Sequence, residues 1–251
     1  MKYLPLAVSF GLVMAVWGAC SLAFGTTLMP SPPQVGRELM TLMGDPACWT
    51  TVSITIFRGL VGLAASLVCA LVLGVAAGSS PLTMRLLAPL VAALQSCPPV
   101  LWISLLMVWA GTGTIVPVAV VFATVFPPLF ANIAQGRMTL DKRLFDMARL
   151  YRVPRPRILA RIVLPGLVPY VLAGLSYGAA ASWKVTAVAE FLGSGSGVGA
   201  RIFWAYRMLE IPRLFAWASI VVLFGVFLEL AVIAPLREAA KTYTNRIREG
   251  A

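Results

Sequence analysis

Residues 53–78 read SITIFRGLVGLAASLVCALVLGVAAG, an apolar run with a single charged residue, Arg58. A helix of about 20 residues crosses the hydrocarbon core of a bilayer, and this run is longer than that. Its apolar residues occupy every side of a helix and not one stripe, which is typical of a helix surrounded by lipid and by other apolar helices. The run therefore predicts a transmembrane helix.

The rest of the chain repeats this pattern. Of its 251 residues, 60% are hydrophobic and 12% are charged, and the mean hydropathy is +0.90. Soluble domains carry about 25% charged residues, so the composition excludes a water-soluble globule. No strand-like alternation persists along the chain. We expect an all-α integral membrane protein with one transmembrane domain over residues 1–251 and six spans, at 4–28, 53–78, 87–110, 115–137, 166–189 and 215–236.

The residues that are missing exclude several kinds of site. The chain has no histidine, which rules out His-based zinc sites and Ser-His-Asp triads. Its four cysteines lie far apart with no CxxC pair, so we interpret them as packing residues and expect no metal site. The net charge is +11, but the charges lie between apolar runs and form no stripe that would bind nucleic acid.

The positive charges predict the orientation. With the N-terminus inside, the cytoplasm holds Lys2, Arg85, eight basic residues between 137 and 161, and four in the C-terminal tail. This excess predicts both termini in the cytoplasm. A cleaved leader ending near Cys20 is the alternative for the first run. That run continues to Met29, longer than the apolar region of a leader, so we expect a retained first helix.

Small residues and prolines inside the spans predict how the helices pack. The pairs Gly74/Gly78 and Gly174/Gly178 stand at helical spacing and favour close helix–helix contact, within one chain in preference to between two copies. The pairs Pro98-Pro99 and Pro127-Pro128 predict kinks or broken turns.

The loop 138–165 carries the most information. Apolar residues recur in its first half at steps of three and four, which predicts a short amphipathic helix, and a second helix follows Pro154 and Pro156. The recurring residues are Leu140, Leu144, Met147, Ala148 and Tyr151. Two interpretations stay open on physical grounds: a docking knob for another protein, or a basic helix that rests on anionic lipid.

The loop resembles the EAA loop of ABC importer permeases, E-A-A-x3-G-x9-I-x-L-P. The spacing matches from Asp146 to Pro165, with identity at Ala148, Ile162, Leu164 and Pro165. Arg152 departs from the pattern, because the family has a glycine there that suits a turn with positive φ. We therefore expect Val153-Pro154 to make the turn instead. The resemblance assigns ATPase coupling to Asp146, Met147, Ala148, Arg149, Leu150, Tyr151, Arg152, Val153, Ile162, Leu164 and Pro165.

Three more segments resemble the nitrate/sulfonate/taurine branch of these permeases. Residues 29–32 read MPSP, residues 97–113 run from Cys97-Pro98-Pro99 through Trp102 to Gly113, and residues 183–199 run from Trp183 through Val188-Ala189-Glu190 to Gly197-Val198-Gly199. The resemblance implies a six-helix type I importer permease in a bacterial inner membrane. It also implies two ATPase subunits, a second permease copy and a periplasmic or lipid-anchored binding protein as partners.

The resemblance places ATP hydrolysis on another subunit. The chain has no GxxxxGK[ST], and the glycine-rich run 193–197 lacks the following lysine, so we interpret that run as a flexible outer loop. We expect no cofactor on this chain, with ATP and Mg²⁺ on the partner ATPase, and no enzymatic activity. The substrate class that the branch suggests is a small anion or a heteroaromatic solute.

Ionisable residues inside the spans indicate the pathway. Lys184 near mid-span costs about 2.5–3.5 kcal/mol on insertion scales unless it faces water, a partner or substrate. We expect Lys184, Trp183, Glu190 and Trp102 to line the translocation pathway, with a structural ion pair or outward snorkelling as the alternatives for Lys184. Glu229 pairs with Lys184 or Arg58, or is protonated. The outer loop 190–214, with Arg201, Arg207 and Arg213, meets the binding protein or forms an interfacial belt.

The leading hypothesis is the permease of an ATP-driven importer, working as a homodimer. The alternative is a stand-alone ion-coupled secondary transporter or channel, which predicts intramembrane acidic relays or inverted repeats. A membrane-embedded enzyme would need a cluster of catalytic polar groups at one depth. The absence of histidine and the scarcity of acids argue against it.

Overall fold

The computed structural model describes residues 4–249, and side chains for Val8 and residues 11–242. All regular structure in this part is helical. The elements in chain order are α1 (Leu4–Phe24), α2 (Pro32–Gly44), α3 (Pro46–Ser79), α4 (Pro81–Ser96), α5 (Pro99–Ala110), α6 (Ile115–Thr139), α7 (Lys142–Leu150), α8 (Arg155–Ile158), the π-helical turn η1 (Leu159–Val163), α9 (Leu164–Gly193), α10 (Val198–Arg207), α11 (Ile211–Leu228), the π-helical turn η2 (Glu229–Ile233) and α12 (Ala234–Glu249).

Four helical runs are long and apolar enough to cross a membrane: 46–79, 115–139, 155–193 and 211–242. They contain the expected spans 53–78, 115–137, 166–189 and 215–236, and all four extend beyond them. The expected first span, 4–28, is shorter in the structure because α1 ends at Phe24. The part of α1 whose side chains are described, Gly11–Phe24, is apolar but shorter than the four spanning runs.

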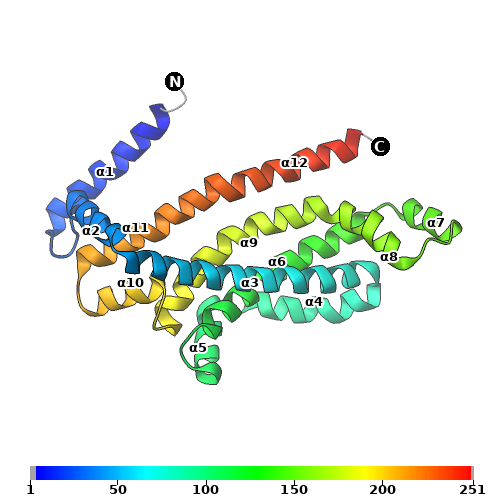
Figure 1. Cartoon of the computed structure of the whole chain (residues 1–251), viewed down its shortest axis with the longest axis horizontal. Coiled ribbons are helices and arrows are strands. Elements are labelled where there is room, and N and C mark those ends of the chain that lie inside the picture. The colour runs from blue at the N-terminus through cyan, green and yellow to red at the C-terminus, as the bar shows by residue number, and fades with distance from the viewer. Residues whose placement is uncertain (1–3, 250–251) are drawn as a thin grey trace.

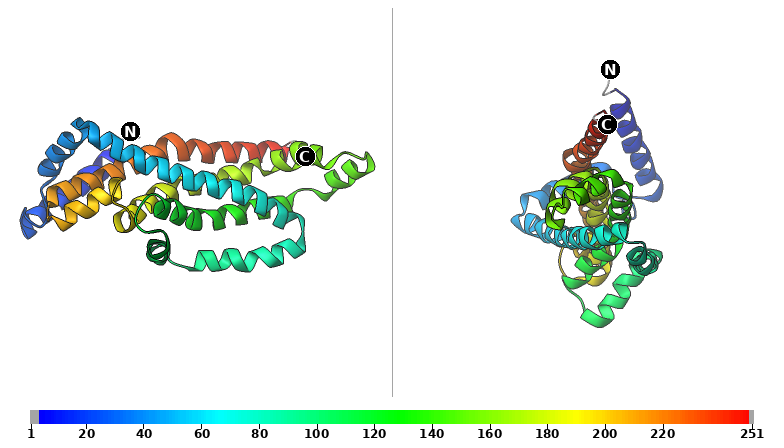
Figure 2. Two further views of the ribbon diagram at one scale, coloured as in Figure 1. Left: turned by 60° about the horizontal axis from the view of Figure 1, so that its bottom comes forward. Right: turned by 90° about the vertical axis from the view of Figure 1, so that its right-hand side faces the viewer.

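The break predicted at Pro98-Pro99 inside the expected span 87–110 is confirmed. α4 and α5 are bent by 94° at the break between Ser96 and Pro99, so together they form at most one broken crossing (Figure 2, left). Pro98 and Pro99 both lack the N–H that would continue the helix, and Cys97 before them is extended, with ψ 121°. By contrast, α6 runs unbroken through Pro127 and Pro128.

The core of the bundle is formed by α3, α6 and α9, with α6 in the middle (Figure 1). Glycines allow this close approach. A Cβ at Gly78 would lie 2.6 Å from the Ala134 carbonyl oxygen of α6, and one at Gly174 would lie 2.8 Å from Leu129 Cδ2. The expected packing role of these glycines within one chain is confirmed.

The two ends of the bundle differ. α7 and α8 project at one end, where α12 also terminates, and α2 and α10 cover the other end (Figure 1). We call these the α7–α8 end and the α2–α10 end. Each of the two longest apolar runs after α6 contains one π-helical turn, η1 before α9 and η2 between α11 and α12.

Candidate functional site

The predicted amphipathic helix of the loop is α7, and its N-terminus is capped. The Asp141 carboxylate accepts a hydrogen bond from the Arg143 backbone N–H at 2.9 Å, which satisfies one of the free donors of the first turn. Ala148 is 1% exposed. The cap stabilises the helix itself, and Phe145 connects α7 to the bundle, because it packs against the core cluster and lies under the Arg137 guanidinium at 4.3 Å.

Arg152 makes the turn that ends α7. Its φ is +50°, in the left-handed region that favours glycine. The Arg152 N–H donates to the Arg149 carbonyl at 3.0 Å and the Val153 N–H donates to the Ala148 carbonyl at 2.8 Å, the two bonds of a Schellman motif. The expectation that Val153-Pro154 would replace this turn was wrong, because Arg152 adopts the left-handed conformation at its own cost.

Large apolar side chains gather on one exposed side of α7, which also exposes Lys142, Arg143, Asp146 and Arg149. Met147, Leu150 and Tyr151 are 50%, 80% and 75% exposed, and Leu144 lies on the same side. Asp146 pairs with Arg149 at 3.4 Å, and both side chains are exposed. The more distant loop residues of the predicted set do not lie on a loop: Ile162 belongs to η1, and Leu164 and Pro165 begin α9.

A buried polar cluster joins α3, α6, α9 and α10, and we call it the Arg58 cluster. It consists of Arg58, Glu190, Thr55, Thr114 and Ser196 with the Gly199 N–H. Arg58 Nη1 pairs with Glu190 Oε1 at 2.8 Å, and the two side chains are 3% and 0% exposed. The other guanidinium hydrogens go to Thr114 Oγ1 and to both oxygens of Ser196. Glu190 Oε2 accepts from Thr55 Oγ1 at 2.8 Å and from Gly199 N at 3.2 Å.

The cluster explains the glycines that follow α9. Gly197 has φ +99°, and a Cβ there would overlap the Glu190 carboxylate. A Cβ at Gly199 would overlap the Ala187 carbonyl oxygen. Our interpretation of 193–197 as a flexible loop was wrong, since Ser196 accepts two bonds from Arg58 and the Gly193 carbonyl accepts from Gly113 N at 3.1 Å.

The four predicted pathway residues do not form one group in a single chain. Glu190 lies inside the Arg58 cluster. Trp183 is buried, and its Nε1 donates to the Val221 carbonyl at 2.9 Å. Trp102 is half-buried by α6, and its indole N–H has no hydrogen-bond partner among the described residues.

Lys184 is exposed beside an apolar cavity of about 400 Å³ between α9 and α11. Glu229 lines the same cavity but pairs with neither Lys184 nor Arg58. Its Oε1 accepts from Arg237 Nη1 at 2.7 Å. The predicted partners of Glu229, Lys184 and Arg58, were therefore wrong. Arg58 pairs with Glu190 and not with Glu229.

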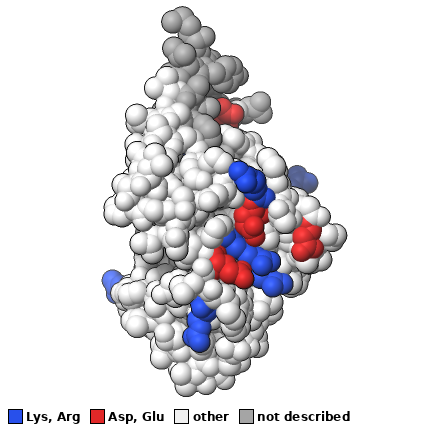
Figure 3. Space-filling view, turned by 90° about the vertical axis from the view of Figure 1, so that its left-hand side faces the viewer, with Lys and Arg blue, Asp and Glu red and all other residues white. Residues whose placement is uncertain are grey.

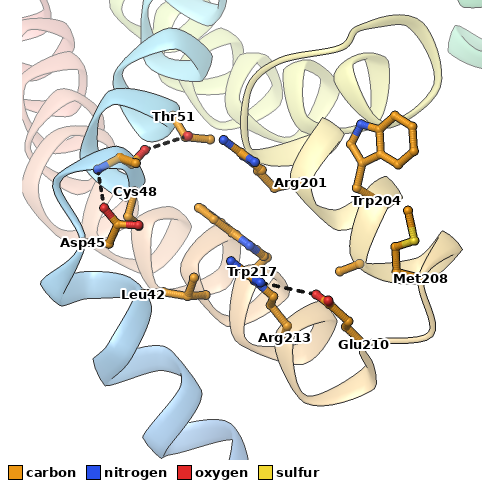
Figure 4. Close-up of a pocket in the computed structure, with 12 residues that line it drawn as sticks. Leu42, Asp45, Cys48, Thr51, Arg201, Trp204, Met208, Glu210, Arg213 and Trp217 are labelled. Carbon is orange, nitrogen blue, oxygen red and sulfur yellow. Dashed lines mark hydrogen bonds and ion pairs between the residues drawn. The ribbon is translucent and has the colours of Figure 1, made fainter.

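Charges of both signs gather at the α2–α10 end (Figure 3). Arg213 contacts Glu210 at 3.4 Å and Glu38 at 4.0 Å. Beside them lies a pocket of about 170 Å³ between the start of α3, α10 and α11, with Trp204 and Trp217 in its wall. Arg201 points from α10 toward Thr51 in this pocket (Figure 4).

Comparisons with known proteins identify the family of this chain. Residues 70–234 match the family described as "Binding-protein-dependent transport system inner membrane component". The chain is 24% identical over 224 residues to the taurine transport system permease protein TauC of Escherichia coli K12, covering 87% of this chain and 82% of that protein.

Two further relatives have related names. The nitrate import permease protein NrtB of Synechocystis sp. is 27% identical over 237 residues, 91% of this chain and 86% of that protein. The putative aliphatic sulfonates transport permease protein SsuC of Bacillus subtilis 168 is 25% identical over 216 residues, 85% of this chain and 78% of that protein. Most of the chain, including the core helices α6 and α9, α7 and α8, and the Glu190 side of the Arg58 cluster, lies within the family match, so this protein belongs to the family of inner-membrane permease components of binding-protein-dependent transport systems.

Proposed function

We propose that this chain is the permease of an ATP-driven importer and that α7 is the element on which a separate ATPase acts. The observation that carries the proposal is the exposed apolar side of α7, formed by Met147, Leu150 and Tyr151. A short helix that ends the bundle and leaves three large apolar side chains uncovered is an interaction surface for a partner protein.

The way α7 is mounted supports this role. Force on a helix reaches the transmembrane bundle only if the helix cannot swivel. Phe145 of α7 packs against the core cluster and lies under the Arg137 guanidinium of α6 at 4.3 Å. Leu140 contacts the start of α9, where a Cβ at Gly166 would lie 2.5 Å from its Cδ2. In this proposal, a push on α7 reaches α6 through Phe145 and α9 through Leu140.

A second copy of the chain completes the pathway in this proposal. Lys184 lies in the second half of α9, nine residues before its end at Gly193, and Val222 and Val226 of α11 share its cavity with 64% and 51% exposure. A lysine at this depth against lipid is costly. If two copies pack through this side, Lys184 of each copy faces the interface between them, where water and substrate pass.

The substrate that fits this pathway is a small anion or a heteroaromatic solute. The relatives are named for nitrate, taurine and sulfonates, which carry an anionic group. Lys184 supplies a positive charge, and Arg58 supplies none because Glu190 neutralises it. A strongly hydrated anion needs such a charge to enter an apolar passage.

The α2–α10 end is the surface that receives the binding protein in this proposal. It carries charges of both signs around Arg213 (Figure 3) and the pocket into which Arg201 points (Figure 4). Complementary charges on a partner set the orientation of docking and raise the association rate.

Assembly with the ATPase tests the coupling surface. We expect Leu150→Asp, co-expressed with the ATPase of its transport system, to insert into the membrane normally and to lose most of the co-purified ATPase. The matched control is Leu209→Asp, because Leu209 is 75% exposed at the opposite end. Equal ATPase recovery from both variants contradicts the assignment.

Transport assays test the pathway and the energy source. In liposomes with ATPase and binding protein, Lys184→Met is expected to lower uptake at least roughly tenfold, while Lys184→Arg keeps the charge and most of the activity. Normal uptake by Lys184→Met removes the pathway role. Uptake by the chain alone, with no ATPase present, would refute the importer assignment in favour of a secondary transporter.

A further inference from the structure

A large groove lies at the α7–α8 end, between the end of α3 and the α7–α8 segment. Its volume is about 1180 Å³. Its polar lining comes from four helices and a turn: Ser79 and Ser80 where α3 ends, Arg137 of α6, Arg149 of α7, Arg152 in the turn after it, and Arg155 at the start of α8. The exposed apolar residues that carry the function proposed above, Met147, Leu150 and Tyr151, do not line this groove.

The charge of the groove is one-sided. Among the described residues that line it, four are arginines and none is acidic. Arg149 has Asp146 beside it at 3.4 Å, but both side chains are largely exposed, and exposed ion pairs contribute little to the free energy of folding. Arg137 stacks on the Phe145 ring at 4.3 Å, and its Nε is buried without a hydrogen-bond partner. Guanidinium groups bind phosphate oxygens through charge-assisted hydrogen bonds.

The remainder of the groove is apolar. Val75, Ile158 and Val163 form part of its lining, and Val163 is 4% exposed. The groove lies where α3 and α6 end, at Ser79 and Thr139, directly beside their apolar spans. A free phosphate would use the arginines alone. A ligand with a phosphate head and an apolar chain would use both parts.

The groove and the exposed apolar side of α7 are separate surfaces. Phe145 and Arg149 stand four residues apart and share the side that lines the groove. Met147 and Leu150 stand three apart on the other side, exposed and absent from the groove. α7 can therefore contact an ATPase and a second ligand together.

We propose that this groove binds an anionic phospholipid, with its phosphate on Arg149, Arg152 and Arg155 and an acyl chain along the apolar lining. The lipid would link α7 and α8 to the end of α3, across a gap that side chains leave open. The inference depends on the membrane location of the family and not on the ATPase assignment.

Thermal unfolding of the full chain in a neutral detergent tests the site. We expect phosphatidylglycerol to raise the melting temperature, and phosphatidylcholine and inorganic phosphate to leave it unchanged, because a ligand that binds only the folded state stabilises it. In the variant R149Q/R152Q/R155Q the apparent affinity for phosphatidylglycerol should fall about a hundredfold, since each basic residue adds to attraction for anionic lipid.

The matched control is R143Q/R157Q/R161Q, which removes three exposed arginines of the same segment that do not line the groove. It should keep the phosphatidylglycerol response within about threefold. Equal loss in both triple variants, or a shift by inorganic phosphate as large as that by the lipid, overturns the proposal. So does an unchanged lipid response with lost ATPase binding, which would assign these arginines to the partner protein. If the groove variant does not fold, native mass spectrometry of bound lipid on R155Q against R157Q decides with the same outcomes.

Discussion

Replacing Glu190 by glutamine should destabilise this protein more than any other single isosteric change we consider. Glu190 Oε1 accepts from Arg58, and Oε2 accepts from Thr55 and from the Gly199 N–H. Glutamine keeps the shape but puts an NH₂ group on one side. An NH₂ group at the Oε1 position would face the Arg58 guanidinium, and an NH₂ group at the Oε2 position would face the Gly199 N–H. Either placement sets a donor against a donor, and Arg58 loses its counter-charge.

The size of the effect follows from burial. The side chains of Arg58 and Glu190 are 3% and 0% exposed, so water cannot replace the lost partner. Removing one member of a buried ion pair costs about 3–5 kcal/mol. Exchanging both residues, as Arg58→Glu with Glu190→Arg, should not restore stability, because Thr55 and Gly199 would then donate toward an arginine.

Reversible unfolding in mixed micelles, followed by tryptophan fluorescence, measures the free energy of unfolding. The control is Glu210→Gln at the pair Glu210–Arg213, with side chains 50% and 48% exposed, where we expect a change of about 0.5 kcal/mol or less. A loss below about 1 kcal/mol for Glu190→Gln, or a charge exchange as stable as the parent protein, would refute the reasoning.

Three other changes have expected outcomes in the same unfolding assay. Arg152→Gly should raise the free energy of unfolding by up to about 1 kcal/mol, because glycine adopts the left-handed conformation without the steric cost that arginine has. Arg152→Val should lower it, and a valine variant more stable than the glycine variant would contradict this reasoning. Gly174→Val places its Cβ 2.8 Å from Leu129 and should cost about 1–3 kcal/mol, whereas Gly36→Ala, with nothing within 4 Å, should cost nothing measurable. Trp183→Phe removes a bond of 2.9 Å to a carbonyl of α11 and should cost about 1–2 kcal/mol, and an unchanged midpoint would show that this bond contributes nothing.

The long apolar helices and the α7 segment followed from local sequence, whereas α2 was not predicted and α10 lies inside what we expected to be the outer loop 190–214. Apolar residues at steps of three and four between Leu140 and Tyr151 predicted α7, because a helix that lies on a bundle presents one side to it. The position where the resemblance expects glycine is also the left-handed position of the turn. What the sequence did not reveal is that Arg152 itself adopts that conformation, since its tolerance depends on the surrounding hydrogen bonds.

The pairing of charges inside the bundle did not follow from local sequence. Arg58 and Glu190 are 132 residues apart, and no spacing rule connects them. The sequence did contain a signal for this pair. Both residues are ionisable and lie in or beside apolar runs, and a charged residue in such a place requires a partner. Comparing their depths in the membrane would have predicted the pair, because Arg58 and Glu190 lie near the same end of two antiparallel helices. The break at Pro98 was visible as a proline pair, but the same pair in α6 leaves its helix unbroken, and only tertiary packing distinguishes the two.

The π-helical turn η2 rotates the residues of α12 about the helix axis, relative to their positions in a continuous α-helix. Glu229 and Arg237 are eight residues apart, which in a regular α-helix would set them about 80° apart around the axis. One residue of insertion makes their effective separation seven, about 20° from alignment, and the two side chains meet at 2.7 Å. Shortening the chain by one residue inside Glu229–Ile233 would therefore restore plain α-helix and leave α12 facing the same neighbours. The same deletion elsewhere in α11 or α12 would rotate all that follows by about 100°.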